Sequence, residues 1–191
     1  MKEIRIHGRG GQGVVAASEI LAIAFFNDGK NVQAFPNFGV ERSGAPIMSF
    51  VRFSDEEILS REHVYSPDIL IIQDDTLIDK VDIFFGIKND SIILINSKDS
   101  VENIFLKLKE LKKIPSGFKI ENIFVADATS IALEIFGRNI VNTAMLGLLS
   151  RVPNVLKLES ALKAIKEKFS DKRKDVVEKN IEAIKRVYKL K

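Results

Sequence analysis

A glycine-rich segment near the N-terminus has the residue types and spacing of an anion-binding turn. Gly8, Gly10 and Gly13 stand at G-x-G-x-x-G spacing between an expected strand, residues 2–7, and an expected helix, residues 14–29. Gly8 would permit a tight turn with positive φ, Gly10 the approach of a ligand, and Gly13 close packing of helix and strand. Because the first amides of a helix lack partners within it, the turn can bind a phosphate.

Three further residues add to this capacity. Gly11 makes the turn more open than packing requires, Arg9 adds a cation and Gln12 adds an amide. A site for NAD would also need an acidic residue at the end of the second strand, about 20 residues on. The expected second strand, residues 31–35, ends in a phenylalanine followed by Pro36. The sequence therefore indicates a phosphate site that lacks the acidic residue needed to bind a ribose. The alternative is that the glycines are required only for close packing of the helix and the strand.

A long loop, residues 36–46, is expected at the same edge of the sheet as the glycine turn. It contains Arg42, whose guanidinium can bind a phosphate or carboxylate, the hydroxyl of Ser43 and the accessible backbone of Gly44. These residues are further candidates for ligand binding. The alternative is a loop held together internally, for example by an ion pair between Glu41 and Arg42.

Asn142 and Thr143 are polar residues in an otherwise apolar helix expected at 139–152. They are expected to bond to the glycine turn or to face a neighbouring subunit or the entrance to an active site. A pair whose hydrogen bonds go to water or to the backbone is an equal alternative.

Other polar residues support no catalytic role. His7 is interpreted as a hydrogen-bonded structural residue, and His63 lies in a polar loop. Asp74 and Asp75 follow a short strand and are interpreted as a helix N-cap and an acid of the first helical turn. We expect no catalytic residue and no metal ligand in this chain.

The elements that must position these residues alternate along the chain. Further strands are expected at 47–54, 68–74, 91–96 and 122–128, and further helices at 101–111 and 128–137, with two more after Pro153. This alternation predicts an α/β fold that is Rossmann-like, with a mostly parallel sheet, helices on both faces and C-terminal amphipathic helices. The whole chain, residues 1–191, is expected to form one domain.

The composition excludes several classes of protein. The 191 residues are 46% hydrophobic and 29% charged, as in soluble globular proteins, and there is no cysteine for a disulfide, a thiolate nucleophile or an iron–sulfur cluster. No segment is long and apolar enough for a membrane span. We expect a cytoplasmic protein that binds neither membrane nor nucleic acid.

The positive charge is concentrated at the C-terminal end. Residues 157–191 carry twelve Lys or Arg and six Asp or Glu, although the whole chain has a net charge of only +3. Val177, Ile181, Ile184 and Tyr188 follow helical spacing, so the lysines are interpreted as the solvated face of an amphipathic helix. No aromatic residues alternate with the basic ones to stack nucleic-acid bases.

Several segments together resemble a known family. These are GRGGQGVV at 8–15, QAFPNFGVERSGAP at 33–46, SPDILIIQD at 66–74, DATSIALEIFG at 127–137 and NTAMLG at 142–147. In this order they resemble the gamma subunit of four-subunit 2-oxoacid:ferredoxin oxidoreductases, pyruvate:ferredoxin oxidoreductase (pyruvate synthase) above all. The resemblance covers nearly the whole chain.

The resemblance implies a subunit that is catalytic only within its complex. Such a complex decarboxylates a 2-oxoacid on thiamine diphosphate, reduces ferredoxin through iron–sulfur clusters and transfers the acyl group to coenzyme A. Thiamine diphosphate and the clusters would lie on the alpha, beta and delta subunits, with ferredoxin an indirect partner. This chain would contribute a coenzyme A contact, for which the expected residues are Gly8, Arg9, Gly10, Gly11, Gln12, Gly13, Arg42 and Ser43.

Three alternatives remain open at this point. The substrate could be a branched-chain or other 2-oxoacid instead of pyruvate. The chain could be a free-standing nucleotide-binding or regulatory domain. An independent NAD(P)-dependent oxidoreductase is disfavoured, because the second strand does not end in an acidic residue and there is no separate substrate domain.

Overall fold

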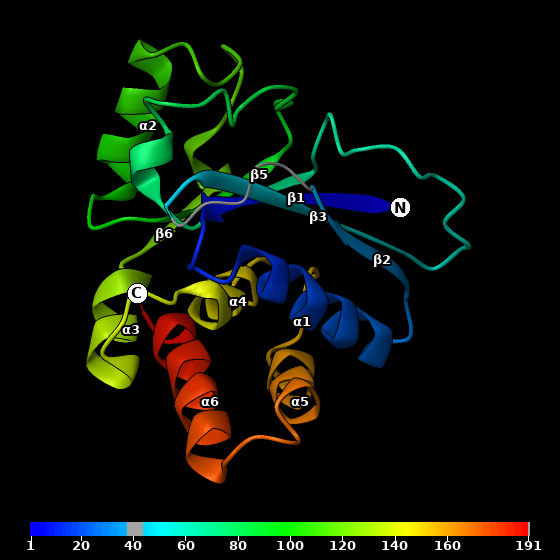
Figure 1. Ribbon diagram of the computed structural model, residues 1–191. Coiled ribbons are helices and arrows are strands. Elements are labelled where there is room, and N and C mark those ends of the chain that lie inside the picture. Colours follow the sequence, from blue (N-terminus) through cyan, green and yellow to red (C-terminus); the bar gives the residue numbers. More distant parts are fainter. Residues whose placement is uncertain (38–43, 191) are drawn as a thin grey trace.

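A sheet of six strands, in the order β2-β3-β1-β4-β5-β6, forms the frame of the molecule (Figure 1). The computed structural model describes residues 1–37 and 44–190. The strands are β1 (Lys2–Arg9), β2 (Asn31–Pro36), β3 (Pro46–Ser54), β4 (Ile69–Ile72), β5 (Ile92–Asn96) and β6 (Ile123–Ala126). The α-helices are α1 (Val14–Asn27), α2 (Val101–Glu110), α3 (Ala128–Phe136), α4 (Asn142–Leu149), α5 (Leu158–Lys168) and α6 (Lys174–Tyr188). Two short 3₁₀ helices are η1 (Asp75–Leu77) and η2 (Ile120–Asn122).

The sheet is mostly parallel, as the sequence predicts. β1, β4, β5 and β6 pair in parallel, whereas β3 runs antiparallel to both of its neighbours, β1 and β2. Only nine residues separate β2 from β3. A parallel crossover needs a dozen or more residues, so this short connection reverses the chain direction.

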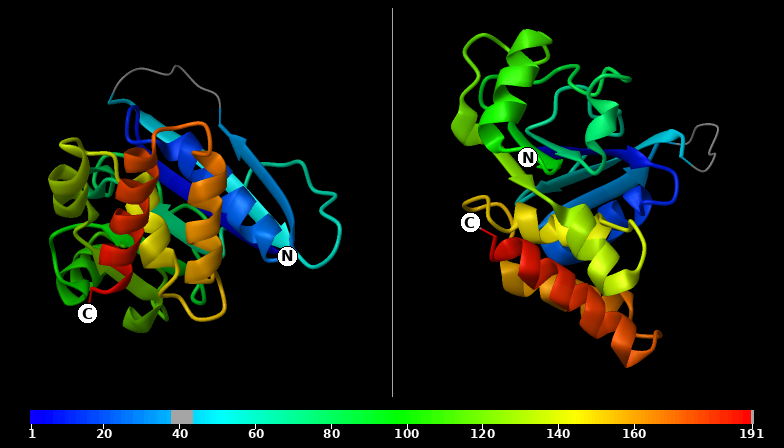
Figure 2. Two further views of the ribbon diagram at one scale, coloured as in Figure 1. Left: turned by 90° about the horizontal axis from the view of Figure 1, so that it is seen from below. Right: turned by 90° about the vertical axis from the view of Figure 1, so that its left-hand side faces the viewer.

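Helices cover both faces of the sheet, but unequally. α2 and the 3₁₀ helices lie on one face, while α1, α3, α4, α5 and α6 lie on the other (Figure 1). α1 and α4 form the layer next to the sheet, and α5 and α6 lie outside them (Figure 2). This arrangement explains why α1 is apolar nearly all round: it packs against the sheet on one side and α5 on the other.

The two C-terminal helices are amphipathic and pack on other helices, not on the sheet. In α6 the buried side is formed by Asn180, Ala183, Ile184 and Val187. Tyr188, expected in the apolar stripe, is 39% exposed, because Val187 occupies the position three residues after Ile184. The lysines of these helices lie on the exposed side, as expected.

Two of the boundaries that differ from the sequence prediction lie next to the glycine turn or pack against it. β1 continues to Arg9 because its last residues pair with the start of β3, Gly8 with Ile47 and Arg9 with Pro46. The helix expected at 139–152 is confined to Asn142–Leu149. All eight of its residues are buried.

Gly147 allows α4 and α6 to approach closely. A Cβ atom at this position would collide with the backbone carbonyl of Ile184 in α6. We expect Gly147→Ala to lower the free energy of unfolding by about 3 kcal/mol, because a backbone carbonyl cannot move aside as a flexible side chain can. Urea denaturation of the subunit measures this. Glu178→Ala, on the exposed side of α6, should change stability by less than about 0.5 kcal/mol. Equal effects of the two substitutions would contradict the close packing.

Candidate functional site

The glycine turn lies at the carboxyl edge of the sheet, beside the point where the strand connections diverge. β1 leads through α1 toward β2 at one side of the sheet, whereas β4 leads toward β5 at the other. In open α/β sheets, ligands bind in the crevice formed at such a switch point. The residues after β1 and those after β4 therefore form the candidate site.

The glycines of the turn serve different purposes. Gly8 does not have the expected positive φ; it lies within β1, where a Cβ atom would approach Val14 Cγ2 to 2.7 Å. Positive φ occurs instead at Gly11 (+95°) and Gly13 (+78°). A Cβ at Gly13 would lie 2.5 Å from Nδ2 of Asn142, and nothing lies within 4 Å of that position at Gly11. Gly11 is thus the open point of the turn.

The start of α1 presents backbone amides toward the crevice. Gly13 caps the helix without a side chain, and the amides of Val14, Val15 and Ala16 donate to no acceptor among the described residues. The amide of Gly10, by contrast, donates to Ala45 O (2.9 Å). A helix start without a capping side chain leaves these amides and the positive end of the helix dipole available to an anion.

Arg9 and Gln12 are bound to other parts of the protein. Arg9 donates from Nη1 to Gly44 O (3.0 Å) and from Nη2 to Thr76 Oγ1 (2.6 Å), and its Nε lies 3.3 Å from Asp74 Oδ2. Gln12 donates to the same Asp74 oxygen (2.9 Å) and accepts from the Arg9 amide (2.8 Å). These two side chains therefore fasten the turn to the β2–β3 loop and to the end of β4.

Asp74 provides the negative charge that balances Arg9. It caps η1, as the sequence predicts, by accepting from the amide of Thr76. Its partial burial would raise its pKa, but hydrogen bonds from Thr76 and Gln12 and the charge of Arg9 outweigh that effect, so the pKa of Asp74 is lowered. The charge of Arg9 is thus already compensated within the protein.

The other expected site residues are only partly brought together here. Arg42 and Ser43 lie outside the described residues. Gly44 joins the turn, since its amide donates to Gly10 O (3.1 Å). Asn142 packs against Gly13, but it and Thr143 are only 5% and 1% exposed. The chain itself covers both residues, so the expectation that they face another subunit is wrong.

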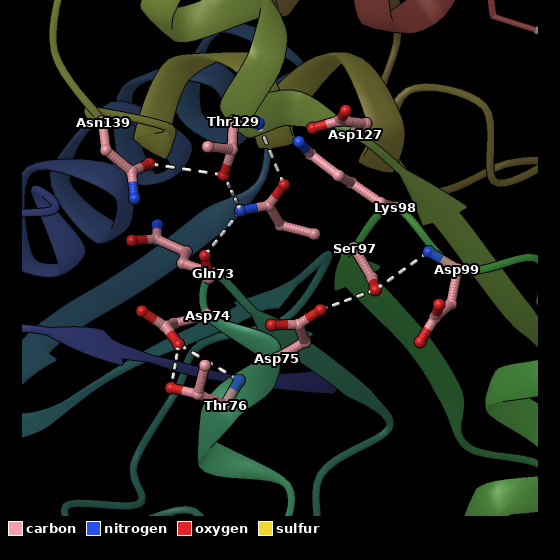
Figure 3. Close-up of a pocket in the computed structure, with 11 residues that line it drawn as sticks. Gln73, Asp74, Asp75, Thr76, Ser97, Lys98, Asp99, Asp127, Thr129 and Asn139 are labelled. Atoms are coloured by element: carbon pink, nitrogen blue, oxygen red, sulfur yellow. Dashed lines mark hydrogen bonds between the residues drawn. The ribbon is translucent and has the colours of Figure 1, made fainter.

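A pocket of about 300 Å³ continues the crevice over the ends of β4, β5 and β6 (Figure 3). Asp75 accepts a hydrogen bond from Ser97 (2.6 Å), and Asp127 caps α3 through Ser130 (2.9 Å). Four aspartates and one lysine make the lining acidic. It consists of Gln73, Asp74, Asp75, Thr76, Asn96, Ser97, Lys98, Asp99, Asp127, Thr129 and Asn139.

Of the lining residues, the sequence patterns single out only Asp74 and Asp75, and Gln73 is the most unusual of those they miss. Its side chain is 0% exposed, and neither Oε1 nor Nε2 has a hydrogen-bond partner among the described residues. The sequence does contain a pattern that could have identified Gln73: it is the polar residue that directly follows an apolar strand, at the edge of a parallel sheet where ligands bind.

The two histidines line a separate pocket of about 330 Å³ beside β1. His7 is buried beside Arg5, and His63 packs on the ring of Phe50 with 5.1 Å between ring centroids. The Nε2 atom of His7 has no partner among the described residues, so the interpretation of His7 as a hydrogen-bonded residue is wrong at this atom.

His7 should make the protein sensitive to acid. Burial, together with the nearby charge of Arg5, lowers the pKa of His7 to about 3. Between about pH 6.5 and pH 3, the unfolded chain therefore binds a proton at this residue that the folded chain does not. The free energy of unfolding should fall with falling pH, by up to about 1.4 kcal/mol per unit, and His7→Phe should remove this slope. Urea denaturation between pH 4 and pH 7 checks this; equal slopes in both proteins would contradict it.

Two other kinds of site are absent from the residues that the structure describes. Among the described residues, no group of three or more His, Asp or Glu side chains is placed to hold a metal ion. Over the same ranges, no helix has the length and apolar character needed to cross a membrane.

Comparisons with known proteins agree over nearly the whole length. The family model described as "Pyruvate ferredoxin/flavodoxin oxidoreductase" matches residues 3–190. The chain is 48% identical over 170 residues to the "Pyruvate/ketoisovalerate oxidoreductases common subunit gamma" of Thermococcus kodakarensis, covering 89% of this chain and 88% of the relative. It is 47% identical over 190 residues to "Pyruvate synthase subunit PorC" of Methanothermobacter marburgensis, covering 98% and 96%.

A solved structure has the same fold. The crystal structure of pyruvate oxidoreductase subunit PORC from Thermotoga maritima matches with a TM-score of 0.79 and 39% identity. The match covers 98% of this chain and 94% of that one.

Proposed function

The chain belongs to the pyruvate ferredoxin/flavodoxin oxidoreductase family as a gamma-type subunit, and from that premise we propose that it binds the diphosphate of coenzyme A for the complex. The observation that carries the proposal is the uncapped start of α1. Val14, Val15 and Ala16 present amides without acceptors in the described structure, and Gly11 leaves the approach open. A diphosphate supplies the negative charge and the acceptor oxygens that such a helix start lacks.

The six residues of the turn divide this task. The backbone from Gly11 onward contacts the diphosphate, while Gly8 and Gly13 allow the tight packing that holds α1 in place. Arg9 and Gln12 act as positioning residues, because their hydrogen bonds already join three segments around the turn. By sequence, Arg42 and Ser43 remain candidates for a phosphate contact.

Pyruvate is the proposed 2-oxoacid of the complex, and a branched-chain 2-oxoacid is the alternative. The Thermococcus relative carries the name of a subunit common to pyruvate and ketoisovalerate oxidoreductases. A shared subunit is compatible with more than one 2-oxoacid, so we assign the choice of substrate to the other chains.

The remaining parts of the reaction belong to the partners. The alpha, beta and delta subunits are the proposed partners; they would carry thiamine diphosphate and the iron–sulfur clusters and pass electrons to ferredoxin. A chain without cysteine offers no thiolate to a cluster. We further propose that residues 1–191 form one gamma-type domain and that the complex is cytoplasmic.

Reconstitution of the complex with and without this chain tests the proposal. With the chain present, coenzyme A should bind and acyl-coenzyme A should form. Without it, the remaining subunits should retain decarboxylation of the 2-oxoacid with an artificial electron acceptor but should lose binding of coenzyme A. Undiminished binding of coenzyme A to a complex that lacks this chain would contradict the proposal.

A further inference from the structure

We propose that the uncharged, thiol-bearing arm of coenzyme A runs from the glycine turn into the pocket over β4, β5 and β6, where Gln73 is its hydrogen-bond partner. This inference rests on the proposed coenzyme A site and adds the direction in which the molecule lies across it. The phosphorylated adenosine end would then lie outside this pocket.

Among the side chains that line the pocket, Gln73 is the one with buried polar atoms that lack partners within the described structure. Asn96 makes three hydrogen bonds: its Nδ2 donates to Gln73 O and Thr129 Oγ1 (both 2.8 Å), and its Oδ1 accepts from the Thr129 amide (3.1 Å). The Gln73 amide, although 0% exposed, has no partner at either polar atom within the described structure. A buried amide without partners destabilises a fold, whereas an apolar side chain of similar size would not. A ligand that supplies both a donor and an acceptor explains why glutamine occupies the position.

The Gln73 amide lies next to the glycine turn. Its Oε1 is 3.1 Å from where a Cβ of Gly8 would stand. Figure 3 shows its side chain at the same side of the pocket as Asn139, away from Ser97 and Asp99. A molecule whose diphosphate lies at the start of α1 therefore meets this amide as it enters the pocket.

The charge of the pocket decides which end of the carrier enters. Four aspartates and one lysine line it, and Arg9 balances only Asp74, so the remaining negative charge would repel a phosphorylated adenosine there. The other arm of coenzyme A is uncharged and contains two amides. Each of these amides offers one donor and one acceptor, which complements the donor and the acceptor of a glutamine side chain.

Gln73→Met in the reconstituted complex tests the inference. The substitution keeps the volume of the side chain and removes both hydrogen-bonding atoms. We expect KM for coenzyme A to rise roughly tenfold, and the melting temperature of the subunit to rise by roughly 2–4 °C. A purely structural role of the amide predicts a lower melting temperature instead. Gln33→Met is the matched control: the Gln33 amide donates to Ile58 O (3.2 Å), so its loss should not raise the melting temperature, and KM should not change.

Analogues of coenzyme A locate the contact. An analogue with a methylene in place of the amide nitrogen nearest the thiol should bind the unsubstituted complex less well, and Gln73→Met should abolish that difference. The ratio of KM values for coenzyme A and dephospho-coenzyme A should stay the same in the variant. If Gln73→Met left KM for coenzyme A unchanged, or changed only the ratio of KM values for coenzyme A and dephospho-coenzyme A, the proposed direction of coenzyme A across the site would be wrong.

The glycine turn distinguishes the two possible failures. If Gly10→Val with Gly11→Val raises KM for coenzyme A but Gln73→Met does not, the carrier binds at the turn and the inference about its arm is wrong. If neither substitution changes KM, the proposed coenzyme A site itself is wrong.

Discussion

In the assembled complex, Gly10→Val combined with Gly11→Val should raise KM for coenzyme A by roughly ten- to a hundredfold. At Gly11 nothing lies within 4 Å of the Cβ position, so a valine there would occupy the open side of the turn, and the backbone φ of +95° would strain it. The expected size corresponds to the loss of one charge-assisted hydrogen bond from a backbone amide to the diphosphate. Decarboxylation without coenzyme A should change less than about twofold, because that chemistry takes place on other subunits. Steady-state kinetics with coenzyme A and with an artificial acceptor alone measure the two quantities.

Gly29→Val provides the matched control. Gly29 has a φ of +78° and nothing within 4 Å of its Cβ position, like Gly11, but it lies beyond the opposite end of α1. Its substitution imposes a similar strain at a distance from the crevice, so KM for coenzyme A should not change. A comparable rise in KM for both proteins would mean that the double substitution acts through strain and not through the ligand.

Arg5→Met should cause the largest loss of stability, about 3–5 kcal/mol. The Arg5 guanidinium donates to four backbone carbonyls, those of Val64, Tyr65, Ile83 and Phe85, at distances from 2.6 to 3.2 Å. It thereby holds two loops against the sheet, and burial lowers its pKa to about 10. Methionine would leave these carbonyls without their donor, and buried polar groups without partners are costly. Urea denaturation of the subunit measures the loss.

An exposed arginine tests whether burial causes this loss. Arg186 in α6 pairs with Glu134 at 2.5 Å, and both side chains are exposed. Arg186→Met should cost at most about 1 kcal/mol, because water screens an exposed pair. If Arg5→Met cost no more than this, its four hydrogen bonds would not be what secures the two loops.

The features that could be predicted from the sequence depend on local patterns. The strand–turn–helix unit around Gly8–Gly13, the apolar strands β4 and β5, and the N-cap at Asp74 each follow from a few neighbouring residues. The mostly parallel sheet follows from the alternation of strands and helices. For the same reason the position of the candidate site was predictable, since the carboxyl ends of parallel strands meet at one edge.

The missed features depend on contacts between distant parts of the chain. Arg9 was expected to offer its charge to a phosphate, but it pairs with Asp74, 65 positions further along. Gly8 was expected to need a positive φ. Its glycine is explained instead by Val14, whose side chain lies too close to leave room for a Cβ atom at Gly8. Asn142 and Thr143 were expected to bond to the glycine turn or to face a partner subunit or an active-site entrance; Asn142 does pack against Gly13, but the packing of α4 inside the chain buries both residues. No short-range pattern contains these contacts.

Hydrogen exchange of the intact complex, with and without coenzyme A, tests the central claim most directly. Peptides that cover residues 8–16 report on the amides of the glycine turn and of the start of α1. Coenzyme A should slow exchange at Val14, Val15 and Ala16, whose amides lack acceptors in the described structure. If saturating coenzyme A slows exchange in other subunits and leaves these amides unchanged, this turn does not bind the diphosphate.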